Sequence, residues 1–175
     1  ALPISLALDV DQAESGEGWA RCAVQKDSGD DPDVTHGVLV YARVSHAAEG
    51  VAIDGGEGVG RVTKPGLDQP VGAAAINSVP RRMIAGAVRE IAQQQGHAGG
   101  FAVLLSIPAG VELAARTFNP RLGIEGGLSI IGTTGIVEPM SDDAVRETVR
   151  AALRVRRAAG KRCALLTPGN YGEDF

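Results

Sequence analysis

Apolar residues in the first half of the chain come in short runs, and stretches rich in Gly, Asp and Pro separate them. Three such runs cover residues 19–26, 37–45 and 51–54, and a shorter one covers residues 4–8. Runs of this length, divided by turn-forming residues at hairpin spacing, are typical of β-strands. The pattern predicts a small, mostly antiparallel sheet with loops along one edge.

The apolar spacing changes to three and four residues between positions 80 and 96. Met83, Ile84 and Val88 belong to this series, Pro80 suits the first turn of a helix, and Gly96 suits its end. A fully apolar run at residues 101–107 follows, as in a strand that is buried on both faces. Residues 111–116 are then predicted to form a short helical turn.

The last third of the chain alternates between strand and helix patterns. Residues 128–131 and 163–166 are short apolar runs, and a helix is predicted between them from Ser141, a good N-cap, to about residue 159. This order favours a βαβ unit with a parallel sheet. We therefore predict a mixed α/β fold in two parts: residues 1–100 with a sheet, a helix and two loops, and residues 101–175 with an α/β region that is cut short.

Composition and charge limit the function. Hydrophobic residues make up 44% of the chain but aromatic ones only 3%, so the core is aliphatic. A net charge of −4 argues against a nucleic-acid partner, and no apolar run is long enough to span a membrane. Cys22 and Cys163 stand in apolar runs and are predicted to be buried thiols in a reducing cytoplasm. The histidines lack metal-ligand spacing, so no metal site is expected.

Four aspartates, a Thr and a His crowd into residues 26–37, KDSGDDPDVTHG. One interpretation is a loop whose side chains cap its own backbone. The other is a site for a polar ligand or a cation, which would relieve the repulsion between the carboxylates. Asp30 and Asp31 are the candidates for ligand binding. Asp33 and His36 are the candidates for a general base.

A glycine-rich stretch, GGEGVGRVTKPGL, covers residues 55–67. It resembles a dinucleotide-binding fingerprint, but Pro65 and Gly66 follow at once where a helix would be needed. A nucleotide-binding function is therefore disfavoured. The loop could still hold an anionic group on its backbone N–H donors, with Arg61 and Lys64 beside it.

Two arginines stand at the predicted start of the first long helix, shortly after Asn77. Arg81 and Arg82 are unfavourable there because the N-terminal end of a helix dipole is positive. Either both side chains reach solvent, or Arg81 and Asn77 help to bind a ligand that carries carboxylates.

Glycines and hydroxyl residues also gather between residues 117 and 140, in TFNPRLGI and GTTGIVEPM. Small polar residues that follow a strand suit a ligand site at the carboxyl edge of a sheet, and Glu138 could accept hydrogen bonds from ribose hydroxyls. A purely structural crossover is the alternative.

Five segments, in the same order, resemble blocks of the CbiD family of cobalamin-biosynthesis methyltransferases. Residues 26–35 resemble its KDAGDDPDVT block, residues 56–67 its GxGVGxVTxPGL block, and residues 75–81 its PAINPVPR block. Residues 117–135 resemble TFNPRLGIxGGISILGTTG, and residues 166–170 match LTPGN. Ala73 and Ser78 depart from the family pattern, which has Glu and Pro there.

The resemblance implies a cytoplasmic enzyme that uses S-adenosylmethionine to methylate the corrinoid cobalt-precorrin-5B, with cobalt present only in the substrate. The chain then corresponds to a central part of the family's sequence, and we expect it to be inactive alone and to associate with another chain. A non-catalytic corrinoid-binding module is the alternative. The expected donor-binding residues are Thr133, Thr134, Gly135, Glu138, Gly169 and Asn170, and the expected substrate-binding residues are Asp30, Asp31, Arg61, Lys64, Asn77, Arg81, Asn119 and Arg121.

Overall fold

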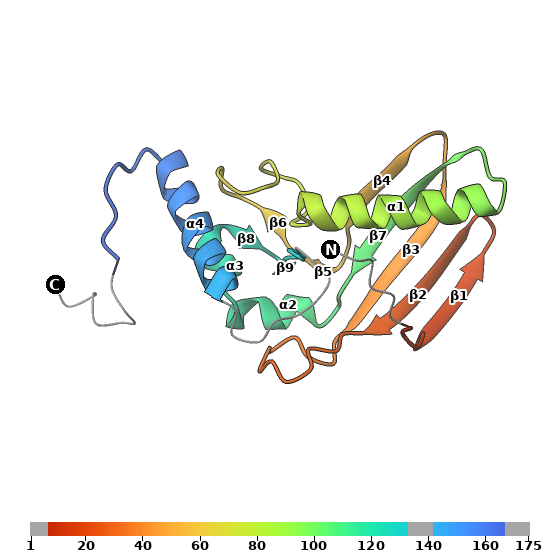
Figure 1. Ribbon diagram of the computed structural model, residues 1–175, viewed down its shortest axis with the longest axis horizontal. Coiled ribbons are helices and arrows are strands. Elements are labelled where there is room, and N and C mark those ends of the chain that lie inside the picture. Colours follow the sequence, from red (N-terminus) through yellow and green to blue (C-terminus); the bar gives the residue numbers. More distant parts are fainter. Residues whose placement is uncertain (1–6, 133–141, 167–175) are drawn as a thin grey trace.

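A five-stranded sheet dominates the computed structural model, which describes residues 7–132 and 142–166 (Figure 1). The spatial order of its strands is β1-β2-β3-β7-β4. Pairing is antiparallel from β1 to β7, and β4 is parallel to β7. The strands are β1 (Gln12–Gly16), β2 (Trp19–Gln25), β3 (Leu39–Ala47), β4 (Val51–Gly55) and β7 (Gly100–Ser106).

The long helix α1 (Ser78–Gln94) connects β4 to β7 and lies across one face of the sheet (Figure 1). Its residues Ile84 and Val88 pack against a core that includes Val103 and Leu105 of β7. Since side chains alternate between the faces of a strand, every second residue of β7 meets the helix. The elements β4, α1 and β7 therefore form a parallel βαβ unit.

The other described elements build a second, smaller layer of short strands and helical turns together with one long helix, α4. It comprises β5 (Gly58–Val59), β6 (Arg61–Val62), α2 (Gly110–Leu113), the 3-10 helix η1 (Ala114–Arg116), α3 (Asn119–Leu122), β8 (Ile124–Glu125), β9 (Gly127–Leu128) and α4 (Asp142–Ala158). The glycine-rich stretch supplies β5 and β6, which pair with β9 in parallel and with β8 antiparallel. No helix in the described ranges is long and apolar enough to cross a membrane.

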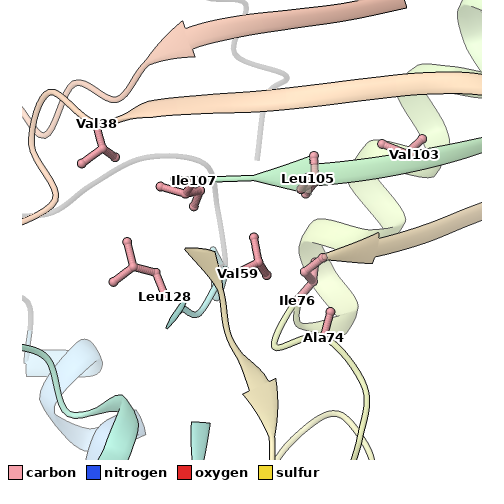
Figure 2. Packing of buried hydrophobic residues seen from close by; sticks show 8 residues of the cluster. All are labelled: Val38, Val59, Ala74, Ile76, Val103, Leu105, Ile107 and Leu128. Carbon is pink, nitrogen blue, oxygen red and sulfur yellow. The ribbon is translucent and has the colours of Figure 1, made fainter. Parts of the chain in front are cut away.

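One aliphatic cluster joins the two layers, as the composition predicted. Figure 2 shows Val38, Ile107, Leu128 and Val59 gathered around the end of β7. These side chains come from the residue before β3, the residue after β7, and the short strands β9 and β5. Ile76 is fully buried in the same cluster. Burial of apolar surface at this point holds the loops after β2, β4 and β7 together.

Three stretches of backbone touch beside this cluster, and glycine is required where they do. Gly58 has a φ of 72°, and a Cβ there would overlap the carbonyl oxygen of Ile107. A Cβ on Gly110 or on Gly127 would in turn overlap the backbone of Gly58. The glycine-rich stretch thus lies against the backbone of two other segments of the same chain, around residues 107–110 and at residue 127.

The structure confirms the mixed α/β fold, and the predicted elements at residues 19–26, 37–45, 51–54 and 80–96 agree with β2, β3, β4 and α1 to within a few residues. The predicted helix after Ser141 is α4. The predicted strand at residues 128–131 is shorter, since β9 ends at Leu128 and only Ile130 adds an isolated bridge to Ile76. The strand β1 was not predicted, and most of residues 4–8 lies outside the described residues.

Several predictions for the second half are wrong. Residues 163–166 form no strand, and Leu165 and Leu166 are 76% and 68% exposed. The parallel βαβ unit lies instead at β4-α1-β7, across the division predicted at residue 100. The run at residues 101–107 is not buried on both faces, because Leu104 is 38% exposed. An apolar run reveals a strand, but the covering of its second face depends on distant segments.

Both cysteines are exposed, so the prediction of buried thiols is also wrong. Cys22 is paired with Ala42 in the register and thus points to the face that carries α1. The helix packs over the β4 and β7 side of that face and leaves this part of β2 open. Cys163 lies in the exposed segment after α4.

We predict that Gly58→Ala destabilises the fold by roughly 2–4 kcal/mol, because the new methyl group meets a backbone carbonyl at a positive φ. Gly86→Ala is the matched control, since Gly86 lies in α1 with nothing within 4 Å of its added Cβ. It should stabilise the protein by about 0.5–1 kcal/mol. Urea unfolding measures both, and equal effects would contradict the packing role of Gly58.

Candidate functional site

Two of the predicted motifs begin at one edge of the sheet. The register pairs Gln25 with Leu39, Tyr41 with Ser106 and Gly55 with Leu105. The ends of β2, β4 and β7 therefore lie along one line, which we call the carboxyl edge. The Asp-rich loop, residues 26–38, and the glycine-rich stretch both begin there (Figure 1). Ligands of open parallel sheets bind at such an edge.

Asp33 is held inside the Asp-rich loop by both of its carboxylate oxygens. Oδ2 accepts a hydrogen bond from Nζ of Lys26 at 2.6 Å, and Oδ1 accepts from the backbone N–H and the hydroxyl of Thr35, both at 2.8 Å. Burial raises the pKa of Asp33, but these hydrogen bonds and the charge of Lys26 outweigh it, and the pKa lies below 3.8. A carboxylate with a lowered pKa and three donors is poorly suited to accept a proton.

His36 is also engaged within the loop. Its Nδ1 accepts a hydrogen bond from the backbone N–H of Ser28 at 3.1 Å. In the neutral ring the proton is then on Nε2, so His36 would have to release Ser28 before Nδ1 could act as a base. The geometry of Asp33 and His36 favours the interpretation of a loop that caps its own backbone.

The other aspartates of the loop differ in whether they form a hydrogen bond within it. Asp27 accepts a hydrogen bond from the backbone N–H of Gly29, while Asp30 is exposed and Asp31 is half-buried. Within residues 7–132 and 142–166, no three His, Cys, Asp or Glu side chains are grouped so that they could hold a metal ion. Asp30 and Asp31 are the carboxylates of the loop for which no structural bond is seen in the described part of the chain, and their role in ligand binding stays a prediction.

Arg61 binds the end of β4 instead of projecting freely. Its guanidinium donates to both carboxylate oxygens of Asp54, at 2.8 and 3.1 Å, and to the carbonyl of Gly55 at 2.8 Å. Hydrogen bonds from Arg61 lower the pKa of Asp54, against the opposing effect of burial, and the backbone N–H of Gly55 and the charge of Arg81 lower it further. Asp54 and Arg61 are both partly exposed, so an ion pair of this kind adds little stability.

Arg81 fixes the start of α1 through backbone carbonyls. Its Nε donates to Ile76 at 2.8 Å, one terminal nitrogen to Ile53 at 2.6 Å, and the other to Ala74 at 3.3 Å. Carbonyl oxygens thus supply the negative partner that a cation needs at this end of a helix. The expected binding of a substrate carboxylate by Arg81 stays a prediction.

The two arginines also block the free edge of the sheet. The residues that flank β4, Gly50 and Gly56, form backbone hydrogen bonds with β7. The backbone N–H and C=O groups of the even-numbered residues of β4 therefore point toward β7, and those of the odd-numbered residues point away from the sheet at its outer edge. The outward carbonyls of Ile53 and Gly55 accept hydrogen bonds from the arginines just described. Such covering prevents another strand from pairing with an exposed edge.

Asp68 caps α1 from ten residues upstream, a role that the local sequence pattern did not predict. One carboxylate oxygen accepts hydrogen bonds from the backbone N–H of Ser78 at 2.7 Å and from its hydroxyl at 2.8 Å. The residue directly before the helix, Asn77, makes no capping bond with its side chain. Burial raises the pKa of Asp68, but hydrogen bonds from Gln69 and Ser78 and the charge of Arg82 outweigh it, and the pKa lies below 3.8.

The two predicted asparagines anchor the segment that leads to the GTTG loop. The backbone N–H of Asn77 donates to Ile130 at 2.9 Å. Asn119 is buried, where its amide donates to the carbonyl of Gly127 at 3.2 Å and its amide oxygen accepts from the hydroxyl of Ser129 at 3.0 Å. These contacts place Ile130 beside the start of α1.

Lys64 and Arg121 are the predicted cations that remain exposed. The stem of Lys64 lies against Gly123, and the guanidinium of Arg121 lies 6.0 Å from the ring centre of Phe118. Neither forms an ion pair with the described residues. All the predicted donor-binding residues, which are Thr133, Thr134, Gly135, Glu138, Gly169 and Asn170, lie outside the described residues.

Comparison with known proteins identifies relatives along nearly the whole chain. Residues 2–139 match the family model described as CbiD. The cobalt-precorrin-5B C(1)-methyltransferase of Ruminiclostridium cellulolyticum is 48% identical over 172 residues, which cover 98% of this chain and 45% of that protein. The enzyme of the same name from Geobacillus kaustophilus is 55% identical over 157 residues, covering 89% of this chain and 42% of that protein.

A solved structure is also similar. The crystal structure of the cobalamin biosynthesis protein CbiD from Archaeoglobus fulgidus has a TM-score of 0.53 and 30% sequence identity, covering 82% of this chain and 46% of that one. The chain thus spans a little under half the length of the proteins it matches.

We predict that Arg81→Lys lowers the free energy of unfolding by about 1–3 kcal/mol, because an ammonium cannot reach the three carbonyls that the planar guanidinium reaches. Arg82→Lys is the control, since Arg82 is exposed and the substitution keeps its charge near Asp68. Chemical denaturation of both variants tests this. A loss of stability in Arg82→Lys as large as in Arg81→Lys would contradict it.

Removal of the cap by Asp68→Ala should cost about 1 kcal/mol near neutral pH. The folded pKa lies below the unfolded one, so the stabilisation is complete above the unfolded value near 3.8 and is lost as pH falls through the lower folded value. The difference from the wild type should therefore shrink only below pH 3.8. Thermal unfolding across this range checks it, with Asp9→Ala as an exposed carboxylate control. A difference that does not change with pH would contradict the role of the ionised carboxylate.

Proposed function

Because the chain belongs to the CbiD family, we propose that it forms part of an enzyme that transfers a methyl group from S-adenosylmethionine to cobalt-precorrin-5B. The substrate is a corrinoid whose cobalt is part of the substrate and needs no site of its own on the protein. The relatives are named as methyltransferases, which favours an enzyme over a non-catalytic corrinoid-binding module. A cytoplasmic location belongs to the same proposal.

The observation that carries the proposal is the meeting of the family-like segments around one end of the sheet. The Asp-rich loop and the glycine-rich stretch begin at the carboxyl edge. The glycine-rich stretch pairs with residues 124–128, which belong to the family-like segment 117–135. Methyl transfer from a sulfonium to carbon is an in-line displacement, which depends on alignment of two reactants more than on a strong acid or base. The internal bonds of Asp33 and His36 fit such chemistry.

The corrinoid carries acetate and propionate groups, and exposed cations suit these. Lys64 and Arg121 offer charges that no described carboxylate neutralises, so we assign them to substrate carboxylates. Arg61 and Arg81 contribute by holding the edge of β4 and the start of α1 in place. Asn77 and Asn119 position the segment around Ile130 in the same way.

We assign the methyl donor to the segments beyond Ile130 and beyond Leu166. The hydroxyls of Thr133 and Thr134 and the carboxylate of Glu138 suit the amino-acid and ribose parts of S-adenosylmethionine, and Gly135 and Gly169 allow close approach of backbone. Asn170 can both donate and accept hydrogen bonds. The hydrogen bond from the backbone N–H of Asn77 to Ile130 supports this assignment, because it places Ile130, shortly before the first of these segments, beside the start of α1.

A chimera tests the proposed function. This chain replaces the matching residues of the Ruminiclostridium cellulolyticum enzyme, to which it is 48% identical. With cobalt-precorrin-5B and S-adenosylmethionine, the chimera should yield a product heavier by one methyl group in mass spectrometry. The unchanged relative and a reaction without S-adenosylmethionine are the controls. A chimera that has the circular dichroism of the relative and binds S-adenosylmethionine but forms no methylated product would refute the proposal.

A further inference from the structure

The five-stranded sheet has one face that no described helix covers. α1 packs against the face that carries Val103 and Leu105, so the alternate residues of each strand point the other way. We call this second surface the open face. It presents Trp19 and Arg21 from β2, Tyr41, Arg43 and Ser45 from β3, Ala102, Leu104 and Ser106 from β7, and Ala52 and Asp54 from β4.

The middle of the open face is hollowed. The register places Ser45, Ala102 and Ala52 side by side on three neighbouring strands, and their small side chains leave space above the backbone. The resulting shallow cavity has a volume of about 310 Å³. Its lining is formed by Arg43, Ser45, Ala52, Ile53, Asp54, Ala102, Val103 and Leu104.

An apolar floor and a cationic rim meet in this hollow. Leu104 is 38% exposed in the row between Arg43 and Asp54. Asp54 is neutralised by Arg61, whereas Arg43 forms no ion pair with any described residue. The guanidinium of Arg43 lies 4.5 Å from the ring centre of Trp19, which holds it at the rim. The hydroxyl of Ser45 adds a donor beside it.

We propose that the open face binds the corrinoid macrocycle, with Arg43 pairing with one of its carboxylates and Leu104 and the small residues contacting the ring. The inference rests on the proposed function, since it names the place where that substrate lies. A broad, largely apolar ring with charged side groups complements a flat floor with one free guanidinium at its rim. The open face continues to Ser106 and thus reaches the carboxyl edge where the predicted loops begin.

A second copy of the chain is the competing occupant, and the composition of the open face disfavours it. Sheets that pack on each other need apolar rows, whereas here Arg21 is paired with Glu14 and Arg61 with Asp54 across the surface. Burial of these ion pairs against another protein would cost desolvation.

The test uses cobyrinic acid, a corrinoid with free carboxylates, and cobinamide, whose corresponding groups are amides. Trp19 is the only Trp in the chain and lies beside Arg43, so its fluorescence reports on ligand at this place. Cobyrinic acid should quench it, and Arg43→Ala should weaken the binding by about tenfold. Ala52→Glu should weaken it further by filling the hollow with a negative charge. Arg89→Ala, an exposed arginine of α1, should change nothing.

Each outcome of these measurements either supports or overturns corrinoid binding at the open face. Quenching by cobyrinic acid that Arg43→Ala and Ala52→Glu weaken, with much weaker binding of cobinamide, supports it. Cobyrinic acid that binds in calorimetry with equal affinity to the wild type and to both variants overturns the open face as its site and leaves the proposed function intact. No binding in calorimetry also overturns it, and the proposed function is then decided by methyl transfer in the chimera. A dimer in sedimentation that Ala52→Glu dissociates would assign the open face to a second copy and refute the inference.

Discussion

Contact between three stretches of backbone at Gly58 is the constraint on which the rest of the structure depends. Gly58 lies against Ile107, at the end of β7, and against Gly127, at the start of β9. No side chain fits between these stretches, and the pairing of β5 with β9 follows from the contact. The aliphatic cluster of Val38, Val59, Ile107 and Leu128 closes over it. Segments from four parts of the chain thereby reach the same end of the sheet.

Cations near this end divide into two groups by what they bind. Arg61 and Arg81 donate to backbone carbonyls and thereby cover the outer edge of β4 and join it to α1. Lys64 and Arg121 stay in solvent, where an anionic ligand can reach them. A guanidinium that donates hydrogen bonds to backbone carbonyls has a structural role, whether or not it also binds a ligand. The same applies to Asp33, whose pKa is lowered by donors from its own loop.

The sheet offers two kinds of surface to a ligand. Its carboxyl edge is lined by loops, and its open face supplies a floor of small side chains next to Arg43. α1 is the one long helix in the connection from β4 to β7, and a single helix can cover only one face of the sheet. The distribution of side chains agrees with this, since Val103 and Leu105 are buried under the helix and Leu104 between them is exposed. The open face thus follows from the topology of one βαβ unit.

The sequence by itself determined the local elements and the family. Periodicity located β2, β3, β4, α1 and α4, because the spacing of apolar residues depends only on the geometry of each element. The five motif blocks identified the family without knowledge of which residues contact one another in the fold. The sequence also indicated which segments could carry chemistry, and this stays a prediction. The structure shows that the Asp-rich and glycine-rich segments begin at the same edge of the sheet.

Only the tertiary structure decided which strands pair, which side chains are buried and which groups each side chain hydrogen-bonds. It paired β7 with both β3 and β4, left residues 163–166 without a strand, exposed Cys22, and gave Arg81 three carbonyl oxygens. It also revealed that Asp68 caps a helix that begins ten residues later. These outcomes depend on contacts between residues far apart in the sequence. The spacing of apolar residues along the chain does not predict such contacts, because the free energy that selects them comes from burial and hydrogen bonding in the assembled fold.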